Sequence, residues 1–301
     1  MATYSELHRI GFGASLLARA VREGWLVRPQ HGLYVARSVW DRAEYPSDRH
    51  KLIVGAMSRS HPNSIFCLRS AAAVHGIPLL GKPDQRAQIL VNPIRGGRST
   101  RHLYRHQGVP DPAARTIDGV RVTSPARTVV DISRIESFAS GLMSMDHVLH
   151  NDLADMTAIS RVIASMGKRQ GVQRARTVAR YADPLSESAG ESLSRARMIE
   201  LGYDPPQLQV WLTGDDGRQY RVDFFWESLG IAGEFDGFSK YGRTFNGSGE
   251  APGNVVHREK RREEALNRAG YKVVRWNWNE ALRPDRLDEI LRGAGIPRTP
   301  A

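Results

Sequence analysis

Three carboxylates lie in the two apolar runs of the stretch YRVDFFWESLGIAGEFDG, residues 220–237. Asp223 lies inside the first run, and Glu234 and Asp236 lie at the end of the second. Burying like charges on neighbouring strands is costly, because each ionised carboxylate loses its hydration. A divalent cation removes that cost, and carboxylate oxygens are ligands that Mg²⁺ and Mn²⁺ accept. The spacing of these acids therefore predicts a metal site.

The elements around these acids predict how their side chains meet. Strand alternation places Asp223 on one face of the first strand, and Glu234 with Asp236 on one face of the second. An amphipathic helix is expected over residues 186–202, and its Glu191 is expected to close the cluster from above. The predicted order is a helix, three strands, a charged helix and a last strand. This order favours a mixed sheet flanked by helices.

This pattern resembles the PD-(D/E)XK restriction-endonuclease superfamily, and within it the compact domain related to very-short-patch repair nucleases. The resemblance covers most of residues 181–301. Its motifs are an early helical Glu, an Arg-Val-Asp-Phe strand, a Glu-x-Asp-Gly strand end, a charged helix and a Val-Arg-Trp strand. In this chain they are Glu191, residues 221–224, residues 234–237, residues 262–270 and residues 274–276.

The resemblance implies metal-dependent hydrolysis of phosphodiester bonds in DNA, with Mg²⁺ or Mn²⁺ as cofactor. Asp223 and Glu234 would bind the cation, and Glu191 would support it directly or through water. Two alternatives stay open for these residues. Asp223 could pair with Arg275 in an ion network on the sheet face, and Glu191 could belong to a capping box with Ser188.

The catalytic lysine of the family's motif is missing from this chain. Asp236, a further catalytic candidate and second ligand, stands at the position where the family has that lysine. Lys240 is the expected substitute, because it follows the end of the strand that carries the metal ligands. Lys260, on the following helix, is the other candidate. Many members of the subgroup share the Glu-x-Asp form, so the departure does not by itself indicate an inactive enzyme, but it leaves the general base open.

Positive charge is concentrated in the middle of the chain. The 301 residues include 43 Lys/Arg and 32 Asp/Glu, a net charge of +11. Residues 45–135 hold 14 Lys/Arg against 5 Asp/Glu, a net +9, whereas residues 181–301 have a net −2. A localised basic surface is typical of a polyanion partner, although a solubilising surface is the alternative. The densest part, residues 94–107, supplies four candidate nucleic-acid contacts: Arg95, Arg98, Arg101 and Arg105.

The first 43 residues have the outline of a winged helix-turn-helix. Two short helices, ended by Gly11 and Gly24, precede a hairpin over WLVRPQHGLYVA. The second helix would expose Arg19 and Arg22 to phosphates or base edges, and Arg28 lies in the hairpin. The alternative is that these arginines form an ordinary solvated face.

The first 180 residues resemble AbiEi-type abortive-infection antitoxins. The pattern runs through Gly13, Leu17, Val21, Gly24, Leu26, Arg28, Gly32 and Tyr34. The Ser-Ala-Ala helix of residues 68–80 and the Thr-Ser-Pro-x-Arg-Thr…Asp segment of residues 123–131 are also typical of that group. The chain departs from the family in lacking the helix with which such modules usually begin. The resemblance implies DNA binding and a toxin partner encoded nearby.

The composition is that of an ordinary globular protein, with 41% hydrophobic and 25% charged residues. A single cysteine, Cys67, excludes an internal disulfide and fits a reducing cytoplasm. No apolar run approaches the roughly 20 residues that cross a bilayer, so no membrane partner is expected.

We therefore expect an α/β (α+β) fold of three domains: residues 1–43, a winged-helix module; residues 44–180, a basic α/β connecting domain; and residues 181–301, an endonuclease-like domain. The leading functional hypothesis is a DNA endonuclease of defence or mobile-element biology. The alternative is a non-enzymatic, antitoxin-like DNA-binding regulator with a degenerate nuclease fold. A nuclease directed at RNA is a third option.

Overall fold

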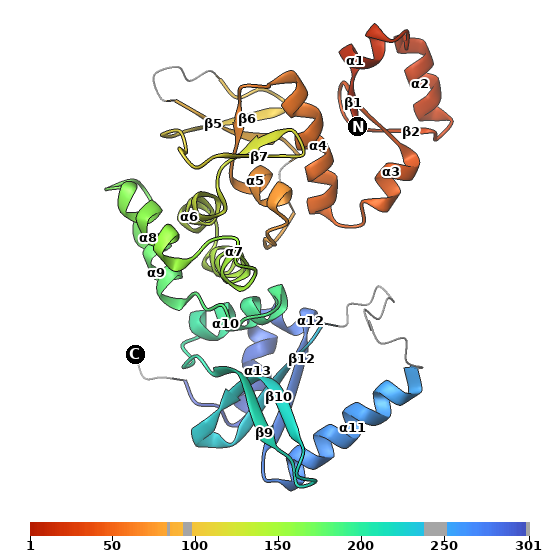
Figure 1. Cartoon of the computed structure of the whole chain (residues 1–301). Coiled ribbons are helices and arrows are strands. Elements are labelled where there is room, and N and C mark those ends of the chain that lie inside the picture. Colours follow the sequence, from red (N-terminus) through yellow and green to blue (C-terminus); the bar gives the residue numbers. More distant parts are fainter. Residues whose placement is uncertain (83–84, 93–97, 238–251, 299–301) are drawn as a thin grey trace. The chain divides into compact units, whose positions relative to one another are not determined.

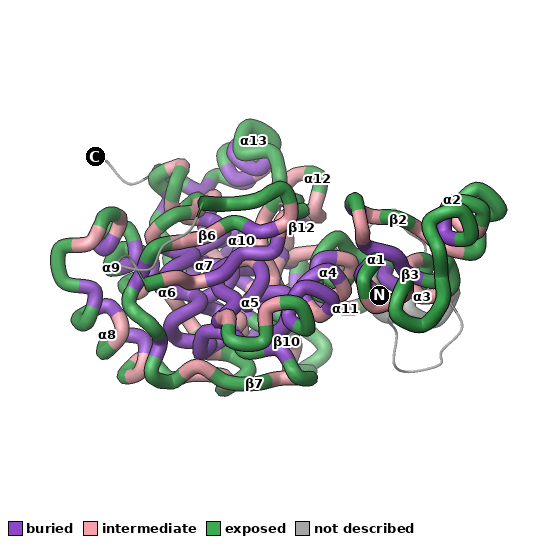
Figure 2. The backbone as a smooth tube through the Cα atoms, turned by 90° about the horizontal axis from the view of Figure 1, so that it is seen from above, coloured by how far each residue is buried: buried purple, intermediate pink, exposed green. Residues whose placement is uncertain are grey.

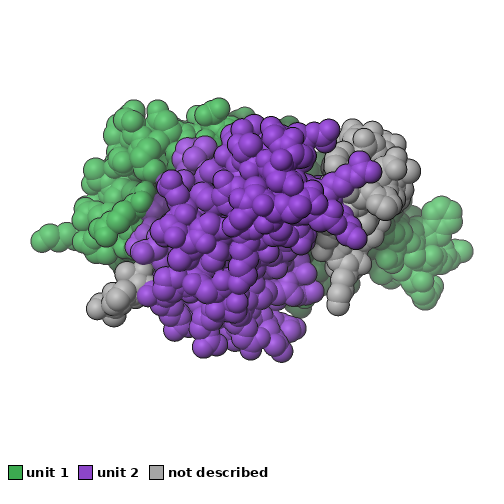
Figure 3. Space-filling view, turned by 90° about the horizontal axis from the view of Figure 1, so that it is seen from below, with its two compact units in different colours: residues 1–180 green, residues 181–301 purple. Residues whose placement is uncertain are grey.

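The computed structural model has the mixed α/β fold expected from the sequence, with helices and three sheets (Figure 1). The chain divides into two compact units, residues 1–180 and 181–301 (Figure 3). The structure describes residues 1–82, 85–92, 98–237 and 252–298, and of these residues 252–258 by their backbone alone.

The first unit begins with a helix pair and a hairpin. Helices α1 (Tyr4–Arg9) and α2 (Ala14–Arg22) precede strands β2 (Leu26–Gln30) and β3 (Leu33–Ala36). Thr3 caps α1 by accepting from the Glu6 backbone, while the Glu6 carboxylate accepts from the Thr3 backbone. A short strand that the sequence did not predict, β1 (Ala2–Thr3), pairs with β3 and completes a sheet of order β1-β3-β2.

A five-stranded sheet forms the centre of the first unit, in the order β6-β5-β4-β8-β7. Two of its pairings are parallel, β5 with β6 and β4 with β8, and β6 is an edge strand. Helices α4 and α5 supply buried side chains to the core cluster that the sheet shares. The elements are α3 (Arg37–Arg42), α4 (Pro46–Ser60), β4 (Ile65–Phe66), α5 (Leu68–His75), β5 (Ala87–Val91), β6 (Leu103–Gln107), β7 (Arg115–Ile117) and β8 (Val120–Val122).

Four helices complete the first unit after the sheet. Helix α6 carries a mostly buried face and packs on α5 and α7. Figure 2 shows α6 and α7 as mostly buried tubes, in contrast to the largely exposed α2. The four are α6 (Pro125–Ile135), α7 (Phe138–His150), α8 (Met156–Ser165) and α9 (Val172–Tyr181).

The second unit is built on a four-stranded sheet of order β12-β11-β10-β9. The Asp-Gly turn at residues 216–217 joins β9 to β10 in an antiparallel pair, and β11 pairs with β12 in parallel. The elements are α10 (Ala189–Glu200), β9 (Gln207–Thr213), β10 (Gln219–Trp226), the 3₁₀ turn Glu227–Leu229, β11 (Ile231–Asp236), α11 (Pro252–Arg268), β12 (Lys272–Asn277), α12 (Trp278–Ala281) and α13 (Pro284–Ala294).

Close packing fixes α10 against this sheet. A Cβ added at Gly190 would lie 2.0 Å from Cε1 of Phe235, so only glycine allows this approach. Trp276 on β12 is 2% exposed, and its indole Nε1 donates to Ser194 Oγ of α10 at 2.8 Å. Trp278 packs edge-on against Phe235, so both tryptophans serve packing in this unit.

The single cysteine, Cys67, is buried at the start of α5. Within the described residues, every helix is too short or too polar to cross a bilayer.

Candidate functional site

The exposed second helix is the most open basic element of the N-terminal module. Along α2 Leu17 is buried and Ala20 and Val21 are half-buried, whereas the other residues of the helix are exposed. Arg22 is exposed, and Arg19 forms an ion pair of 2.7 Å with Glu23 while its own side chain stays 66% exposed. Arg28 in β2 donates to the His31 ring. The structure thus keeps all three predicted arginines at the surface, with Arg22 the least engaged.

The basic segment of the middle domain folds back on the edge strand β6. The backbone nitrogen of Thr100 donates to the Leu103 carbonyl at 2.8 Å, and that of Arg105 donates to Ser99 Oγ at 3.0 Å. Arg105 also donates to the Arg98 carbonyl, so its guanidinium is partly engaged by the loop. Arg98 and Arg101 are exposed. The fourth predicted contact, Arg95, lies outside the described residues.

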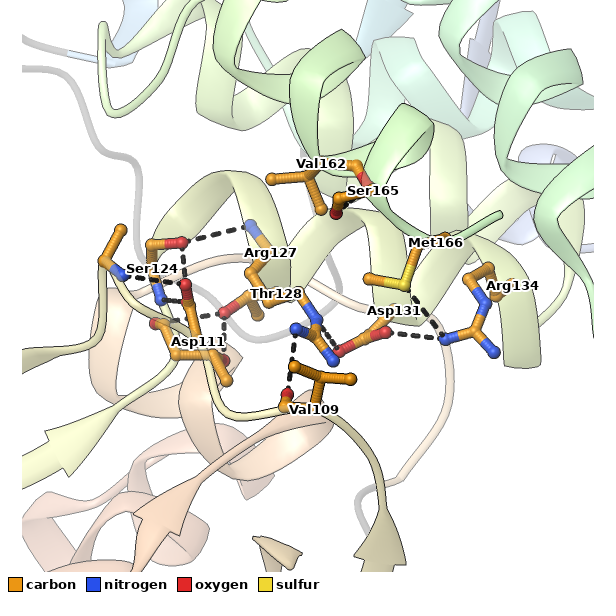
Figure 4. A network of polar contacts seen from close by, with 12 residues as sticks. Val109, Asp111, Ser124, Arg127, Thr128, Asp131, Arg134, Val162, Ser165 and Met166 are labelled. Carbon is orange, nitrogen blue, oxygen red and sulfur yellow. Dashed lines mark hydrogen bonds and ion pairs between the residues drawn. The ribbon is translucent and has the colours of Figure 1, made fainter. Parts of the chain in front are cut away.

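The Thr-Ser-Pro-x-Arg-Thr…Asp segment forms a buried polar network at the start of α6 (Figure 4). Ser124 caps α6, and Asp111 accepts from its backbone nitrogen at 2.7 Å and its hydroxyl at 2.8 Å. Asp131 accepts from Arg127 at 2.7 Å and from Arg134 at 2.8 Å. Arg127 also donates to the Val109 carbonyl. These residues tie α6 to the loop that leaves β6, which is a positioning role.

The strand register of the second unit brings two of the predicted acids together. Phe224 pairs with Gly233, so Asp223 lies opposite Glu234 on neighbouring antiparallel strands. Both carboxylates are largely buried, and loss of hydration raises the pKa of each above its ordinary value. The Asp223 carboxylate accepts a hydrogen bond from the Phe235 backbone at 2.8 Å, which partly offsets that effect.

Glu191 reaches the same cluster from α10, as predicted. Burial is the main cause of its raised pKa, and the Asp223 charge adds to it. Its backbone nitrogen donates to Ser188 Oγ at 3.2 Å, while its carboxylate accepts from the Glu187 backbone at 3.0 Å. Glu191 therefore takes part in helix capping without forming the reciprocal capping box with Ser188.

Gln209 joins Glu191 to Asp223, and sequence reasoning did not identify it. Its amide nitrogen donates to the Glu191 carboxylate at 2.9 Å and also hydrogen-bonds Asp223. Its φ of +54° is in the left-handed region that non-glycine residues rarely adopt. QLQVWLT reads as a regular strand, so the sequence carries no signal for this distortion.

Glu234 differs from the expectation because two arginines neutralise it. Arg262 Nη2 lies 2.6 Å from Oε1, an ionic contact without hydrogen-bond geometry, and Arg275 Nη2 lies 2.8 Å from Oε2. Arg275 is also 3.8 Å from Asp236. The predicted sheet-face ion network with Arg275 is therefore present, but Glu234 is its partner instead of Asp223.

The side chains of the predicted metal ligands are not arranged to bind a divalent cation. In the part of the chain that the structure describes, no group of three or more His, Cys, Asp or Glu residues is arranged to hold a metal ion. Two guanidiniums supply the positive charge that Glu234 would otherwise take from a cation. The roles proposed for Asp223, Glu234 and Glu191 toward Mg²⁺ or Mn²⁺ stay predictions.

The roles of the two lysines proposed to replace the missing motif lysine stay predictions. Lys240 lies outside the described residues. Lys260 is exposed on α11, with Glu264 4.0 Å away as its ion-pair partner. Asp236 is part of the Arg275 network, and burial raises its pKa.

Comparison with known proteins gives two family matches and two full-length relatives. Two proteins of Mycobacterium tuberculosis are each 28% identical to this chain over 279 residues, which cover 91% of this chain and 90% of theirs. They are "Uncharacterized protein MT2308" of strain CDC 1551 / Oshkosh and "Uncharacterized protein Rv2248" of strain ATCC 25618 / H37Rv. The crystal structure of the RV2827C protein from the same species matches with a TM-score of 0.38 at 16% identity, covering 69% of this chain and 78% of that one.

The family matches fall within the first unit. Residues 1–37 match the family described as "Transcriptional regulator, AbiEi antitoxin", and residues 64–180 match the "AbiEi antitoxin C-terminal domain". This finding confirms the resemblance noted for the helix–helix–hairpin module and for the segment of residues 123–131. AbiEi antitoxin-family domains therefore make up residues 1–37 and 64–180 of the chain.

Proposed function

We propose that the chain is an antitoxin-like DNA-binding transcriptional regulator. The observation that carries this proposal is the pairing of two AbiEi-type domains, one described as a transcriptional regulator, with a helix–helix–hairpin module at residues 1–37. In a winged helix-turn-helix the second helix contacts DNA. The exposed, arginine-bearing α2 suits that role.

Charge supports the same assignment. Exposed arginines neutralise phosphates and release counterions, and this term supplies most of the affinity for duplex DNA. Arg22 on α2 and Arg98 and Arg101 beside β6 are exposed in a unit whose residues 45–135 have a net charge of +9. In the second unit, Arg262 and Arg275 are engaged by Glu234 instead.

The proposal extends to a toxin partner encoded beside this chain's gene. The AbiEi antitoxin domain of residues 64–180 is the support for this step. Expression of the neighbouring gene with and without this chain tests it. Growth that stops without the chain and resumes with it is the expected result, and growth unaffected in both cases would remove the toxin from the proposal.

DNA binding is tested by titrating the full chain into labelled duplex DNA from the region upstream of its own gene, at several salt concentrations. Replacing Arg22 by Gln should weaken binding and lower the salt slope by about 1, because one phosphate contact is lost. Arg286→Gln is the matched control, since Arg286 is an exposed helical arginine in the second unit. Equal binding by Arg22→Gln and wild type at every salt concentration would contradict the role of α2.

A second candidate function is a divalent-cation-dependent DNA nuclease in residues 181–301. The observation that favours it is the opposition of Asp223 to Glu234 with Glu191 close by. It ranks second because the carboxylates as arranged do not form a metal cage. Incubating supercoiled plasmid with Mg²⁺ or Mn²⁺ and wild type beside Asp223→Asn decides it. Plasmid nicking by the wild type that Asp223→Asn loses supports the nuclease. DNA binding that survives a chelator, without any nicking, supports the regulator only.

A further inference from the structure

A cavity of about 880 Å³ lies inside the first unit, where the N-terminal module meets the middle domain. Its walls come from the start of α1, one face of α2, the β2–β3 hairpin, the end of α4 and the segment before β6. Protein interiors are otherwise closely packed, and small-molecule sites have volumes of about 300–1,000 Å³. The cavity therefore has the size of a ligand site, and neither the predicted DNA contacts nor the acid cluster of the second unit accounts for it.

One wall of the cavity is apolar and is formed largely by α2. Ala14, Ala18 and Val21 line it and are spaced i, i+4 and i+7, which places them on one face of the helix. Leu33 and Met57, both buried, line the cavity from the hairpin and from α4. The short alanine side chains leave open the space that larger side chains would fill, so the body of a ligand can pack there.

Arg28 and His31 give the cavity a cationic end that offers hydrogen-bond donors. The Arg28 guanidinium lies over the Tyr34 ring, 5.7 Å from its centroid, and donates to Nδ1 of His31. Because a guanidinium cannot accept, His31 Nδ1 is the acceptor, and the proton of this imidazole is on Nε2. None of the described residues that line the cavity is acidic. This end therefore suits an anionic group, which takes charge-assisted hydrogen bonds from Arg28.

Two further histidines line the same cavity and offer acceptors. His61 Nδ1 donates to the Met57 carbonyl at 3.1 Å. His102 Nδ1 donates to Gln30 Oε1 at 2.8 Å, because the amide nitrogen of Gln30 is turned to the Gln85 carbonyl. In the neutral form of either ring Nε2 is then an acceptor, and it has no hydrogen-bond partner among the described residues. Burial lowers the pKa of His102, which keeps that ring neutral near pH 7.

We propose that this cavity binds a small organic phosphate, whose phosphate accepts from Arg28 and His31 and whose hydroxyl or amino groups donate to His61 and His102. A bare inorganic anion would leave the apolar wall unused. The binding site goes beyond the proposed DNA binding and does not depend on it. One consequence does rest on that function: because α2 lines the cavity and also carries Arg22, an occupied cavity should change the affinity for DNA.

Isothermal titration calorimetry of the full chain, without DNA, tests the site with four probes. Adenosine monophosphate and glucose 6-phosphate carry both a phosphate and a body with donors, and they distinguish a nucleotide from a sugar phosphate as the source. Inorganic phosphate has no organic body, and adenosine has no phosphate. We expect at least one of the two organic phosphates to bind about tenfold or more tighter than either inorganic phosphate or adenosine, because the charged head and the body both contribute.

Two variants place the ligand in the cavity. Arg28→Gln removes the charge at the cationic end and should weaken binding of the preferred organic phosphate about tenfold or more. Ala18→Leu fills the cavity from α2 and should block binding. Arg286→Gln and Ala164→Leu are the matched controls and should bind as wild type, because both change exposed helical residues outside the cavity. Circular dichroism checks that each variant is folded.

Each outcome bears on the proposal. Failure of both organic phosphates to bind overturns the site and leaves the DNA-binding proposal intact. Binding that a folded Arg28→Gln or Ala18→Leu variant retains in full also overturns the site, because the ligand then lies elsewhere. Titration of labelled duplex DNA with and without the bound organic phosphate measures the consequence, for which we expect a change in affinity of about fivefold or more. Unchanged DNA affinity removes the regulation and supports the site alone.

Discussion

Replacing Asp131 by Asn should cost the first unit a large part of its stability. The Asp131 side chain is only 7% exposed and lies between Arg127 at 2.7 Å, itself 7% exposed, and Arg134 at 2.8 Å. Asparagine keeps the shape of the side chain and removes its charge, which leaves the Arg127 guanidinium buried without a counter-ion. Removing one partner of such a buried pair costs about 3–5 kcal/mol. Because Arg127 also donates to the Val109 carbonyl, we expect the lower end, about 3 kcal/mol.

Urea unfolding of the full chain, followed by circular dichroism, measures the total change, and hydrogen exchange of peptides from α6 locates it. Asp155→Asn is the control, because Asp155 caps α8 at the surface and Asn caps equally well. The double variant Arg127→Met with Asp131→Leu should recover much of the loss, since apolar residues of similar volume often replace a buried pair without penalty. If Asp131→Asn shifts stability by less than about 1 kcal/mol, the buried pair is not what holds α6 in place.

Two further predictions concern the second unit. Glu191→Gln should make the stability of the second unit less dependent on pH. Because the pKa of Glu191 is raised in the folded state, its protonation contributes stability that is complete below the ordinary pKa of 4.5 and is lost as pH rises through the folded-state pKa. Urea unfolding midpoints of the variant and wild type across that pH range measure the difference. Gly190→Ala should destabilise the second unit by about 1–3 kcal/mol in the same assay, because the new Cβ would clash with the Phe235 ring. Gly293→Ala in α13 is the control: its new Cβ would contact nothing, so it should stabilise the unit by about 0.5–1 kcal/mol.

Local pattern was enough to predict most of the elements. Two short helices ended by Gly11 and Gly24 and a following hairpin were expected, and α1, α2 and the β2–β3 pair are present. Helices α12 and α13 were not predicted, although Pro284 at a helix start and Leu287 with Leu291 one turn apart are the usual signals. The signals for all of these helices and turns come from residues a few positions apart, so they can be read from the sequence alone.

The candidate site depended on partners that local pattern does not specify. Strand alternation placed Asp223 and Glu234 on one side of neighbouring strands, and the register of β10 with β11 sets them opposite each other. It did not predict that Arg262 would pair with Glu234 or that the backbone of Gln209 would turn into the left-handed region. Both facts arise from packing between α11, α10 and the sheet. The acidic cluster therefore predicts a metal site from the sequence, because the arginines that pair with Glu234 come from elements whose packing the sequence pattern does not specify.

The pairing of Glu234 with two arginines bears on which unit would contact DNA in the proposed function. A phosphate can recruit Arg262 or Arg275 only by taking it from Glu234, and a buried carboxylate deprived of its counter-charge is strongly destabilising. The second unit also has a net charge of −2 over residues 181–301, so it repels a polyanion at long range. Three arginines of the first unit, Arg22, Arg98 and Arg101, are exposed and carry no such obligation. For the proposed DNA binding we therefore expect the salt dependence to come from residues 1–180, and a nuclease in the second unit would first have to exchange two arginines for a cation.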